Sequence, residues 1–250
     1  MPFEHDREDL VEGRNAVIEA LRAGRDIDKI YLAKGDTDRT LGHIAARARD
    51  AGIPVVRTDR RKLDAMGATG ANQGVIAVAA VKEYRTLAQL LENAEQKGEP
   101  PLLVLCDGIS DPRNLGAILR AAECAGAHGV ILSKRHSAGV TGVVDKASAG
   151  AAEHVPVARV SNLSAALREL KERGVWIYGS APGAPCSLWD TDLTGPACLV
   201  IGSEGDGMGR LVSEQCDFLM HIPMKGKVDS LNAATACGVL LYEALRQRSG

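Results

Sequence analysis

The chain has 250 residues, enough for two domains with buried cores or for one large domain. Apolar residues make up 45% of it and aromatic residues only 3%, so we expect cores built mainly from Ala, Val, Ile and Leu. The formal net charge is −2, which argues against a general polyanion-binding surface and leaves any nucleic-acid contact to local patches.

The ends of the chain and its cysteines indicate a cytosolic protein. The N-terminal sequence MPFEHDREDL is charged, and no apolar run approaches the roughly 18 residues of a membrane span. None of the cysteines forms a C-x-x-C pair or has zinc-ligand spacing, so we expect reduced, mostly buried side chains and no metal site. The six positions are Cys106, Cys124, Cys186, Cys198, Cys216 and Cys237.

The first eighty residues alternate between helical and β-type patterns. In chain order they predict a helix over 10–23, a strand over 29–33, a helix over about 36–51, a strand over 53–58, a basic helix over 60–66 and a strand over 74–80. Such an alternating unit is long enough to be a domain. Basic side chains recur near its turns, but acidic residues balance them, so a solvated face is as well supported as an RNA-binding one.

We place a linker at residues 81–100, which carry a short helical pattern and end in Gly98 and two prolines. The predicted organisation is therefore a small α/β domain over 1–80, a linker over 81–100 and a second domain over 101–250.

The second domain begins with LLVLCDG, an apolar run typical of a strand covered on both faces. Helical and strand patterns then alternate up to a closing apolar helix that ends near Leu245. This alternation predicts an α/β domain with a largely parallel sheet. Ligands of such sheets gather at the carboxyl ends of the strands.

Common catalytic motifs are absent. The chain has no G-x-G-x-x-G after the first strand of the second domain, no Walker A motif, no H-E-x-x-H and no G-x-S-x-G. The histidines are scattered singly, and His221, beside an apolar strand, is predicted to be a packed or hydrogen-bonded residue rather than a base.

Three stretches of the second domain each follow a predicted strand and combine glycine with polar residues. The first is DGISDPRNLGAILRAA, with Asn114 at the strand-to-helix turn and Arg120 on the following helix; this arginine either faces a cleft or is simply exposed. The second is LVIGSEGDGMG, whose glycines expose backbone groups around Glu204. In the third, HIPMKGKVDSLNAA, we expect Ser230 to cap the closing helix and the backbone near Ile222 and Met224 to line the same pocket.

These stretches match a known family in order and spacing. Asn114-Leu-Gly116-Ala-Ile-Leu-Arg120-Ala, Ile201-Gly-Ser-Glu204-Gly, and Ile222-Pro-Met224 followed by Ser230-Leu-Asn232 resemble the three motifs of the SpoU (TrmH) family of RNA ribose 2′-O-methyltransferases. The sequences EGRNAVIEALRAG and NQGVIAVAA resemble the RNA-binding domain of the RlmB branch, which methylates a guanosine in large-subunit ribosomal RNA. The chain departs from that pattern at Asn72, where the family often has histidine.

The resemblance implies a C-terminal α/β trefoil-knot domain that binds S-adenosylmethionine, and a homodimer with each active site near the subunit interface. It assigns Arg120 to the attacking hydroxyl and an adjacent phosphate, and Asn114 and Glu204 to the shape of the site. It implies that Ser230 and Asn232 position cofactor or ribose, and that Gly202, Ile222, Met224 and Leu231 contribute to cofactor binding. Because the guanidinium pKa lies above about 12, we expect Arg120 to orient and stabilise charge rather than to act as a base.

Other functions remain open at this point. Within the family, a guanosine of transfer RNA is the alternative substrate. A non-catalytic RNA-binding factor of ribosome assembly would share the first domain. A nucleotide-dependent oxidoreductase would share the α/β alternation, but the absence of its glycine fingerprint from this chain argues against it.

Overall fold

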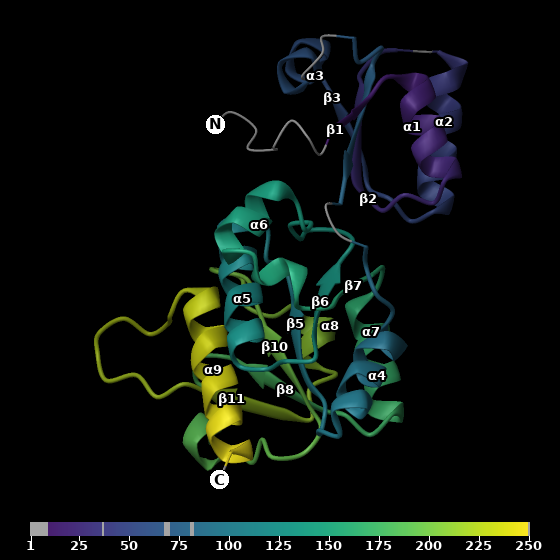
Figure 1. Cartoon of the computed structure of the whole chain (residues 1–250). Helices are drawn as coiled ribbons and strands as arrows, with labels where there is room; N and C mark the ends of the chain where they lie inside the picture. The colour runs from purple at the N-terminus through teal and green to yellow at the C-terminus, as the bar shows by residue number, and fades with distance from the viewer. Residues whose placement is uncertain (1–9, 37, 68–70, 81–82, 250) are drawn as a thin grey trace. The chain divides into compact units, whose positions relative to one another are not determined.

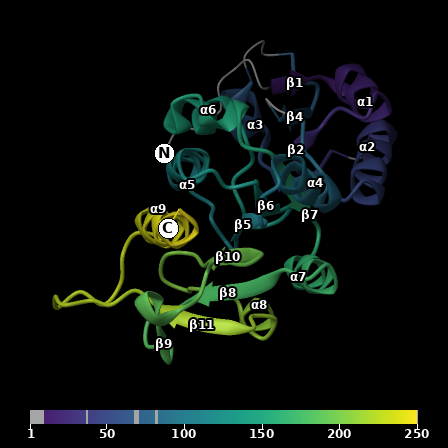
Figure 2. The same cartoon turned by 60° about the horizontal axis from the view of Figure 1, so that its bottom comes forward.

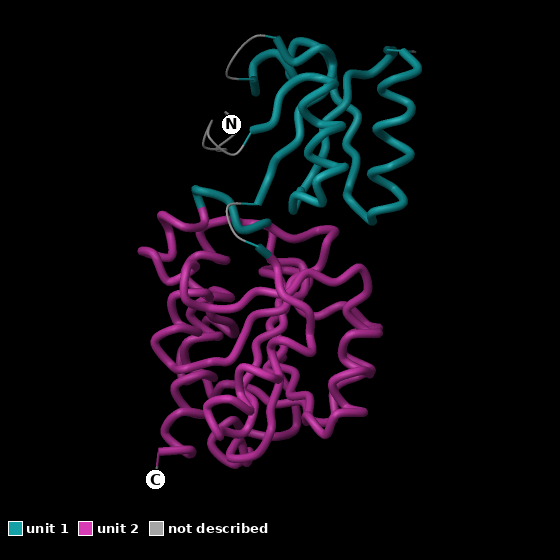
Figure 3. Tube along the Cα trace, turned by 45° about the vertical axis from the view of Figure 1, so that its right-hand side comes forward, with its two compact units in different colours: residues 1–83, 139–143 teal, residues 84–138, 144–250 magenta. Residues whose placement is uncertain are grey.

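The computed structural model describes residues 10–36, 38–67, 71–80 and 83–249. The chain forms two compact units, shown in different colours in Figure 3. The first comprises Met1–Glu83 and Gly139–Val143, and the second comprises Tyr84–Ala138 and Val144–Gly250. The short segment Gly139–Val143 thus groups with the first unit, although both of its neighbours in the chain belong to the second.

The first unit is a four-stranded sheet with helices on both faces. Its elements are β1 (Leu10–Glu12), α1 (Arg14–Arg22), β2 (Ile27–Ala33), α2 (Arg39–Asp50), β3 (Val55–Thr58), α3 (Arg60–Met66) and β4 (Val75–Ala79). The strand order is β1-β4-β2-β3, with β4 antiparallel to β1 and β2, and β2 parallel to β3. Strand β2 is buried on both sides: Ile30 and Leu32 join the core under α1 and α2, while Tyr31 packs with Leu63 and Met66 of α3.

The helix predicted over 10–23 was wrong in its first turn. Residues Leu10–Glu12 form a strand instead, because they pair with β4, Leu10 opposite Val78. Gly13 then turns the chain with φ +91°, a conformation that side chains with a Cβ rarely adopt, so the helix begins only at Arg14.

Helix α4 (Leu87–Lys97) lies in the stretch where we predicted the linker, whose first two residues fall outside the described ranges. A capping box between Thr86 and Gln89 begins it, and Gly98 ends it in the left-handed conformation. Its Leu87 and Leu90 are buried in the core of the second unit.

The second unit is built on a seven-stranded sheet of order β7-β6-β5-β10-β8-β11-β9, in which every neighbouring pair is parallel. The predicted parallel α/β architecture is therefore confirmed. The strands are β5 (Leu102–Cys106), β6 (Gly129–Ser133), β7 (Val157–Val160), β8 (Trp176–Ser180), β9 (Cys186–Ser187), β10 (Ala197–Ile201) and β11 (Phe218–His221). The α-helices after α4 are α5 (Pro112–Cys124), α6 (Gly142–Ser148), α7 (Leu163–Glu172), α8 (Arg210–Ser213) and α9 (Ala233–Arg248), and two 3-10 turns span Ala151–Glu153 and Leu188–Asp190.

Helices cover both faces of this sheet. Helices α5 and α9 lie side by side on one face, and α4 and α7 lie on the other (Figures 1 and 2). No helix within the described ranges is both long enough and apolar enough to cross a bilayer.

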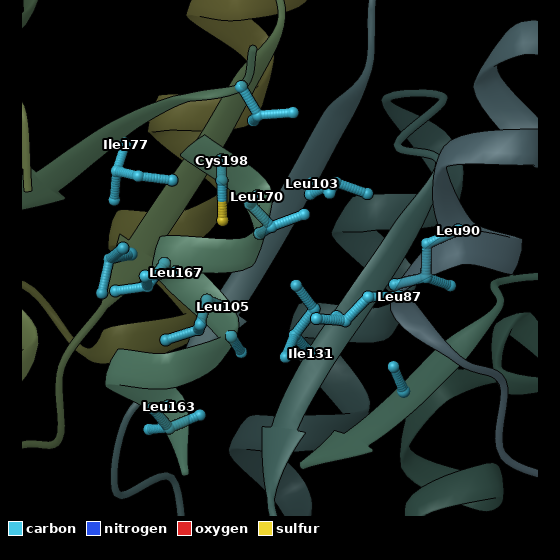
Figure 4. Close-up of a cluster of buried hydrophobic side chains, with 14 of the residues drawn as sticks. Leu87, Leu90, Leu103, Leu105, Ile131, Leu163, Leu167, Leu170, Ile177 and Cys198 are labelled. Carbon is cyan, nitrogen blue, oxygen red and sulfur yellow. The ribbon is translucent and has the colours of Figure 1, made fainter. Parts of the chain in front are cut away.

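The main core of the second unit lies between the sheet and the α4 and α7 layer. Leu90 of α4, Leu167 of α7, Leu105 of β5 and Cys198 of β10 contribute to it (Figure 4). All six cysteines are free; Cys106, Cys198 and Cys237 are buried, whereas Cys124 and Cys186 are exposed. Burial raises the pKa of the Cys106 thiol to about 12, so this side chain acts as a small apolar group.

Candidate functional site

The carboxyl ends of β5, β10 and β11 each lead into one of the three stretches singled out in the sequence. After β5, Asp111 accepts a hydrogen bond from the backbone of Arg113 and Pro112 follows it at the first helical position. Helix α5 therefore begins at once, and Asn114 lies in its first turn rather than in the preceding loop. This early start holds the Asn114 side chain on a rigid element.

Three predicted site residues, Asn114, Glu204 and Asn232, form one hydrogen-bonded group, which we call the polar cluster. Asn114 Nδ2 donates to Glu204 Oε1 at 3.2 Å, and Asn232 Nδ2 donates to Asn114 Oδ1 at 2.9 Å. Asn232 Nδ2 also donates to Glu204 Oε1, and the backbone N–H of Ala233 reaches the same oxygen at 3.4 Å. The Glu204 carboxylate thus joins two segments that lie 90 residues before it and 28 residues after it in the sequence.

Asn232 also begins helix α9. Its Oδ1 accepts from the backbone N–H groups of Ala234 at 3.0 Å and Thr235 at 3.2 Å, so Asn232 is the N-cap. The prediction of Ser230 at that position was wrong by two residues. An asparagine side chain can cap with its oxygen while its Nδ2 binds elsewhere, whereas the Ser230 hydroxyl donates to Asp229 at 3.4 Å.

The residues 202–209, which we call the glycine loop, connect β10 to α8 and close on themselves. Ser203 and Gly207 exchange backbone hydrogen bonds of 3.0 Å, and Gly205 and Gly207 have positive φ. A Cβ at Gly202 would lie 2.2 Å from the carbonyl carbon of Gly207. Only glycine therefore fits at position 202 without moving the loop.

A cavity of about 870 Å³ lies beside the polar cluster. The predicted cofactor-binding residues all line it: Gly202, Ile222, Met224, Ser230 and Leu231. Glu204 and Asn232 also line it, so the polar cluster forms part of its wall.

The sequence did not reveal one wall of this cavity, which consists of Ser180, the last residue of β8, and the following Ala181 and Pro182. These residues carry no motif, but β8 is parallel to β10 and β11, so its carboxyl end reaches the same edge of the sheet.

The cavity suits S-adenosylmethionine, the cofactor that the sequence resemblance implies. Its volume lies within the roughly 300–1,000 Å³ typical of small-molecule sites. The glycine loop, Ile222 and Met224 line the cavity, and their backbone N–H and C=O groups are of the kind that bind a base and a ribose. Leu231 and Met224 supply partly exposed apolar side chains. Carboxylates of Asp206 and Asp229 are available to an ammonium group.

Arg120 does not line this cavity. It is exposed on α5 and makes no hydrogen bond or ion pair with any part of the chain that the structure describes. Arg120 lies six positions after Asn114, which places the two side chains about 120° apart around the helix axis. Asn114 therefore bonds to the polar cluster while Arg120 lies in an exposed stripe with Arg113, Ala117 and Cys124.

Asn72, the departure from the family pattern in the first unit, is fully buried. Its Nδ2 donates to Asp64 at 2.8 Å, and its Oδ1 accepts from the backbone of Gly74 at 3.0 Å. The side chain stabilises the turn before β4, and its burial leaves no surface for an RNA contact.

Two family models match the chain. The SpoU rRNA Methylase family matches residues 101–242, and the model for RNA 2′-O ribose methyltransferase substrate binding matches residues 10–85.

Similar proteins of known name extend over nearly the whole chain. A putative TrmH family tRNA/rRNA methyltransferase, YacO of Bacillus subtilis, is 47% identical over 241 residues, 96% of each chain. The 23S rRNA (guanosine-2′-O-)-methyltransferase RlmB of Ralstonia nicotianae is 46% identical over 242 residues, again 96% of each.

A solved structure with a similar fold contains the cofactor. The SpoU methyltransferase AviRb from Streptomyces viridochromogenes, in complex with AdoMet, is 27% identical with a TM-score of 0.62, covering 96% of this chain and 91% of that one.

Proposed function

Because the chain belongs to the SpoU rRNA Methylase family, we propose that it transfers a methyl group from S-adenosylmethionine to the ribose 2′-hydroxyl of a guanosine in large-subunit (23S) ribosomal RNA. The observation that carries the proposal is the meeting of Asn114, Glu204 and Asn232 at the wall of a cavity lined by the glycine loop. The RlmB enzyme named above supplies the substrate class.

The residues of the chain contribute position more than bond-making chemistry. S-adenosylmethionine supplies a sulfonium-bound methyl group that is already electrophilic. The backbone of Gly202, Ile222 and Leu231 holds the cofactor, and the polar cluster fixes the relative positions of the three segments around it. Holding two reactants in line can be worth an effective molarity of about 10⁵–10⁸ M.

Arg120 orients the ribose hydroxyl and holds an adjacent phosphate. A guanidinium group is a poor base, whereas its planar set of donors binds phosphate oxygens well. Because Arg120 lies on the exposed stripe of α5 and not in the cavity of its own chain, we assign it to the cavity of a second copy.

A homodimer follows from this assignment. Helix α9 packs beside α5 and carries an outward stripe of its own: Thr235, Val239, Tyr242 and Arg246. Tyr242 is 53% exposed, an unusual position for a large side chain on a mostly apolar helix. We propose that the adjoining outer stripes of α5 and α9 form the dimer interface.

The first domain, residues 1–80, binds the RNA substrate, and residues 101–250 carry the catalysis, with 81–100 between them. The match of the substrate-binding model over residues 10–85 supports this division. A substrate in ribosomal RNA agrees with the cytoplasmic location expected from the sequence.

The proposal is tested with purified protein, S-adenosylmethionine labelled in its methyl group, and either 23S ribosomal RNA or transfer RNA. We expect label at a ribose 2′-oxygen of a guanosine in 23S RNA. Label in transfer RNA alone identifies the alternative substrate. Cofactor binding undetectable by calorimetry points to a non-catalytic assembly factor.

Arg120→Ala is expected to abolish methyl transfer while cofactor affinity stays nearly unchanged, because Arg120 does not line the cavity. Arg168→Ala, which removes an exposed arginine from α7, is the matched control and should remain active. Full activity of Arg120→Ala contradicts the assigned role.

Mixing two inactive variants tests whether the partner's Arg120 completes the site. Dimers that combine Arg120→Ala with Asn232→Ala hold one intact site if arginine and cavity come from different chains. Random exchange of subunits between equal amounts of the two variants makes half of the dimers mixed. Because each mixed dimer has one intact site of two, about a quarter of the wild-type activity should return. No recovery in dimers shown to have exchanged subunits indicates an arginine that serves its own chain.

A further inference from the structure

Asp107, the residue that follows β5, contacts both ends of the glycine loop. Its backbone N–H donates to the carbonyl of Ile201 at 2.8 Å, where β10 ends and the loop begins. Its carboxylate Oδ2 accepts from the backbone N–H of Gly209 at 2.7 Å, where the loop enters α8. A single residue thus closes the base of the loop.

The loop between these two points carries Glu204. The backbone hydrogen bonds between Ser203 and Gly207 keep its tip narrow, and they place Glu204 against Asn114 and Asn232. Because Asp107 holds the base of the loop and the Ser203–Gly207 pair closes it, we expect a shift at Gly209 to move Glu204 and the loop residues that line the cavity.

The residue after Asp107, Gly108, also packs closely against the glycine loop. Gly108 has φ +75°, and a Cβ there would lie 3.2 Å from Ser203 Cβ. The segment 107–114 therefore contacts the glycine loop in two places, at its base through Asp107 and at its tip through Asn114.

We infer that Asp107 is a positioning residue for the proposed methyl transfer, acting through the glycine loop and Glu204. Asp107 is absent from the cavity lining, so we assign it a role through the loop and no direct contact with the cofactor. A carboxylate bonded to a backbone N–H is a charge-assisted hydrogen bond, about twice as strong as a neutral one. The inference rests on the proposed function of the cavity.

The test compares Asp107→Ala and Asp107→Asn with Asp217→Ala. Asp217 Oδ2 likewise accepts a hydrogen bond from a backbone N–H, that of Ile177 at 2.9 Å, but at the opposite end of the strands; its Oδ1 also pairs with Lys171 at 2.7 Å. S-adenosylhomocysteine is the calorimetric probe, and hydrogen exchange reports on the amides of Ser203 and Gly207.

We expect Asp107→Ala to weaken S-adenosylhomocysteine binding about 10- to 100-fold, the loss that corresponds to one hydrogen bond to a charged group. Exchange at Ser203 and Gly207 should accelerate. Asp107→Asn keeps an acceptor oxygen but loses the charge, so about half of the bond's free energy remains and binding should be only about 3- to 10-fold weaker than in wild type. Asp217→Ala should lower the melting temperature without changing affinity.

Gly209→Pro tests the same bond from the donor side if Asp107→Ala does not fold. Gly209 has φ −60°, which proline can adopt. The substitution removes the N–H that donates to Asp107 and adds a ring against the same carboxylate, with a Cβ 3.3 Å from Asp107 Oδ2, so the bond is lost from the donor side. Affinity and loop exchange equal to those of Asp217→Ala in either variant overturn the inference. If the wild-type protein does not bind S-adenosylhomocysteine, the proposed function fails instead. Hydrogen exchange at the amides of Ser203 and Gly207 then still decides whether Asp107 holds the loop.

Discussion

Gly202→Ala should weaken cofactor binding through a clash between two parts of the glycine loop. The φ angle of Gly202 is not positive, so alanine is allowed by the backbone and the only obstacle is space. The new Cβ would lie 2.2 Å from the carbonyl carbon of Gly207 and 2.4 Å from the nitrogen of Met208. Both are backbone atoms, so the clash cannot be relieved by rotation of a side chain.

The expected loss follows from the cost of moving this loop. Inserting a methyl group into a well-packed region costs about 1–3 kcal/mol. If the loop relieves the clash by leaving its binding position, the same free energy opposes its return when the cofactor binds. At about 1.4 kcal/mol per tenfold change, affinity for S-adenosylmethionine should fall about 5- to 150-fold.

Calorimetric titration with S-adenosylmethionine measures this change, and Gly195→Ala is the matched control. Gly195 also lacks a positive φ, and nothing lies within 4 Å of the position of its added Cβ. The control should bind as wild type does. If Gly202→Ala binds within about twofold of Gly195→Ala, the contact of Gly202 with Gly207 does not shape the cofactor site.

Two further substitutions test other parts of the second unit. Asn232→Asp keeps the oxygen that caps α9 but places a second carboxylate against Glu204. Helix stability, measured by circular dichroism, should hold, while methyl-transfer activity should fall by at least about tenfold. Activity equal to that of wild type would contradict the role of the polar cluster. Burial, together with the positive charge of Lys97, lowers the pKa of His128. The unfolded chain therefore takes up a proton that the folded chain resists, and this contribution to stability is present above about pH 6.5 and lost as the pH falls below it. Urea unfolding across that range should show the loss in wild type and less of it in His128→Gln, whereas parallel profiles would exclude His128 as the cause.

Much of the fold could be predicted because its strands are strongly patterned. Continuous apolar runs such as that of β5 are buried on both faces, and α3 begins and ends where its pattern indicated. Strand β1 could not be recognised, because its three residues also continue the helical pattern of α1. Whether residues 10–12 form a strand or a helical turn depends on their pairing with β4 and on the turn at Gly13.

The site was predictable to the extent that its residues carry motifs. Asn114, Glu204 and Asn232 were found through the family resemblance, and the structure adds that one carboxylate oxygen joins them. Asp107 was not singled out, because its role depends on a hydrogen bond to a residue 102 positions later. Nothing in the local sequence indicates that distance.

Arg120 shows how a motif can single out a residue without indicating which cavity that residue serves. Asn114 and Arg120 belong to one motif, yet about 120° of helix rotation separates their side chains. Helix α5 can bond to the polar cluster with the face that carries Asn114 and present the face that carries Arg120 to a neighbouring molecule. The exposed position of Arg120, its lack of an ion pair with any described residue and the adjoining outer stripe of α9 all agree with that division. The six-residue spacing between Asn114 and Arg120 therefore supports the proposal of a site completed by two chains.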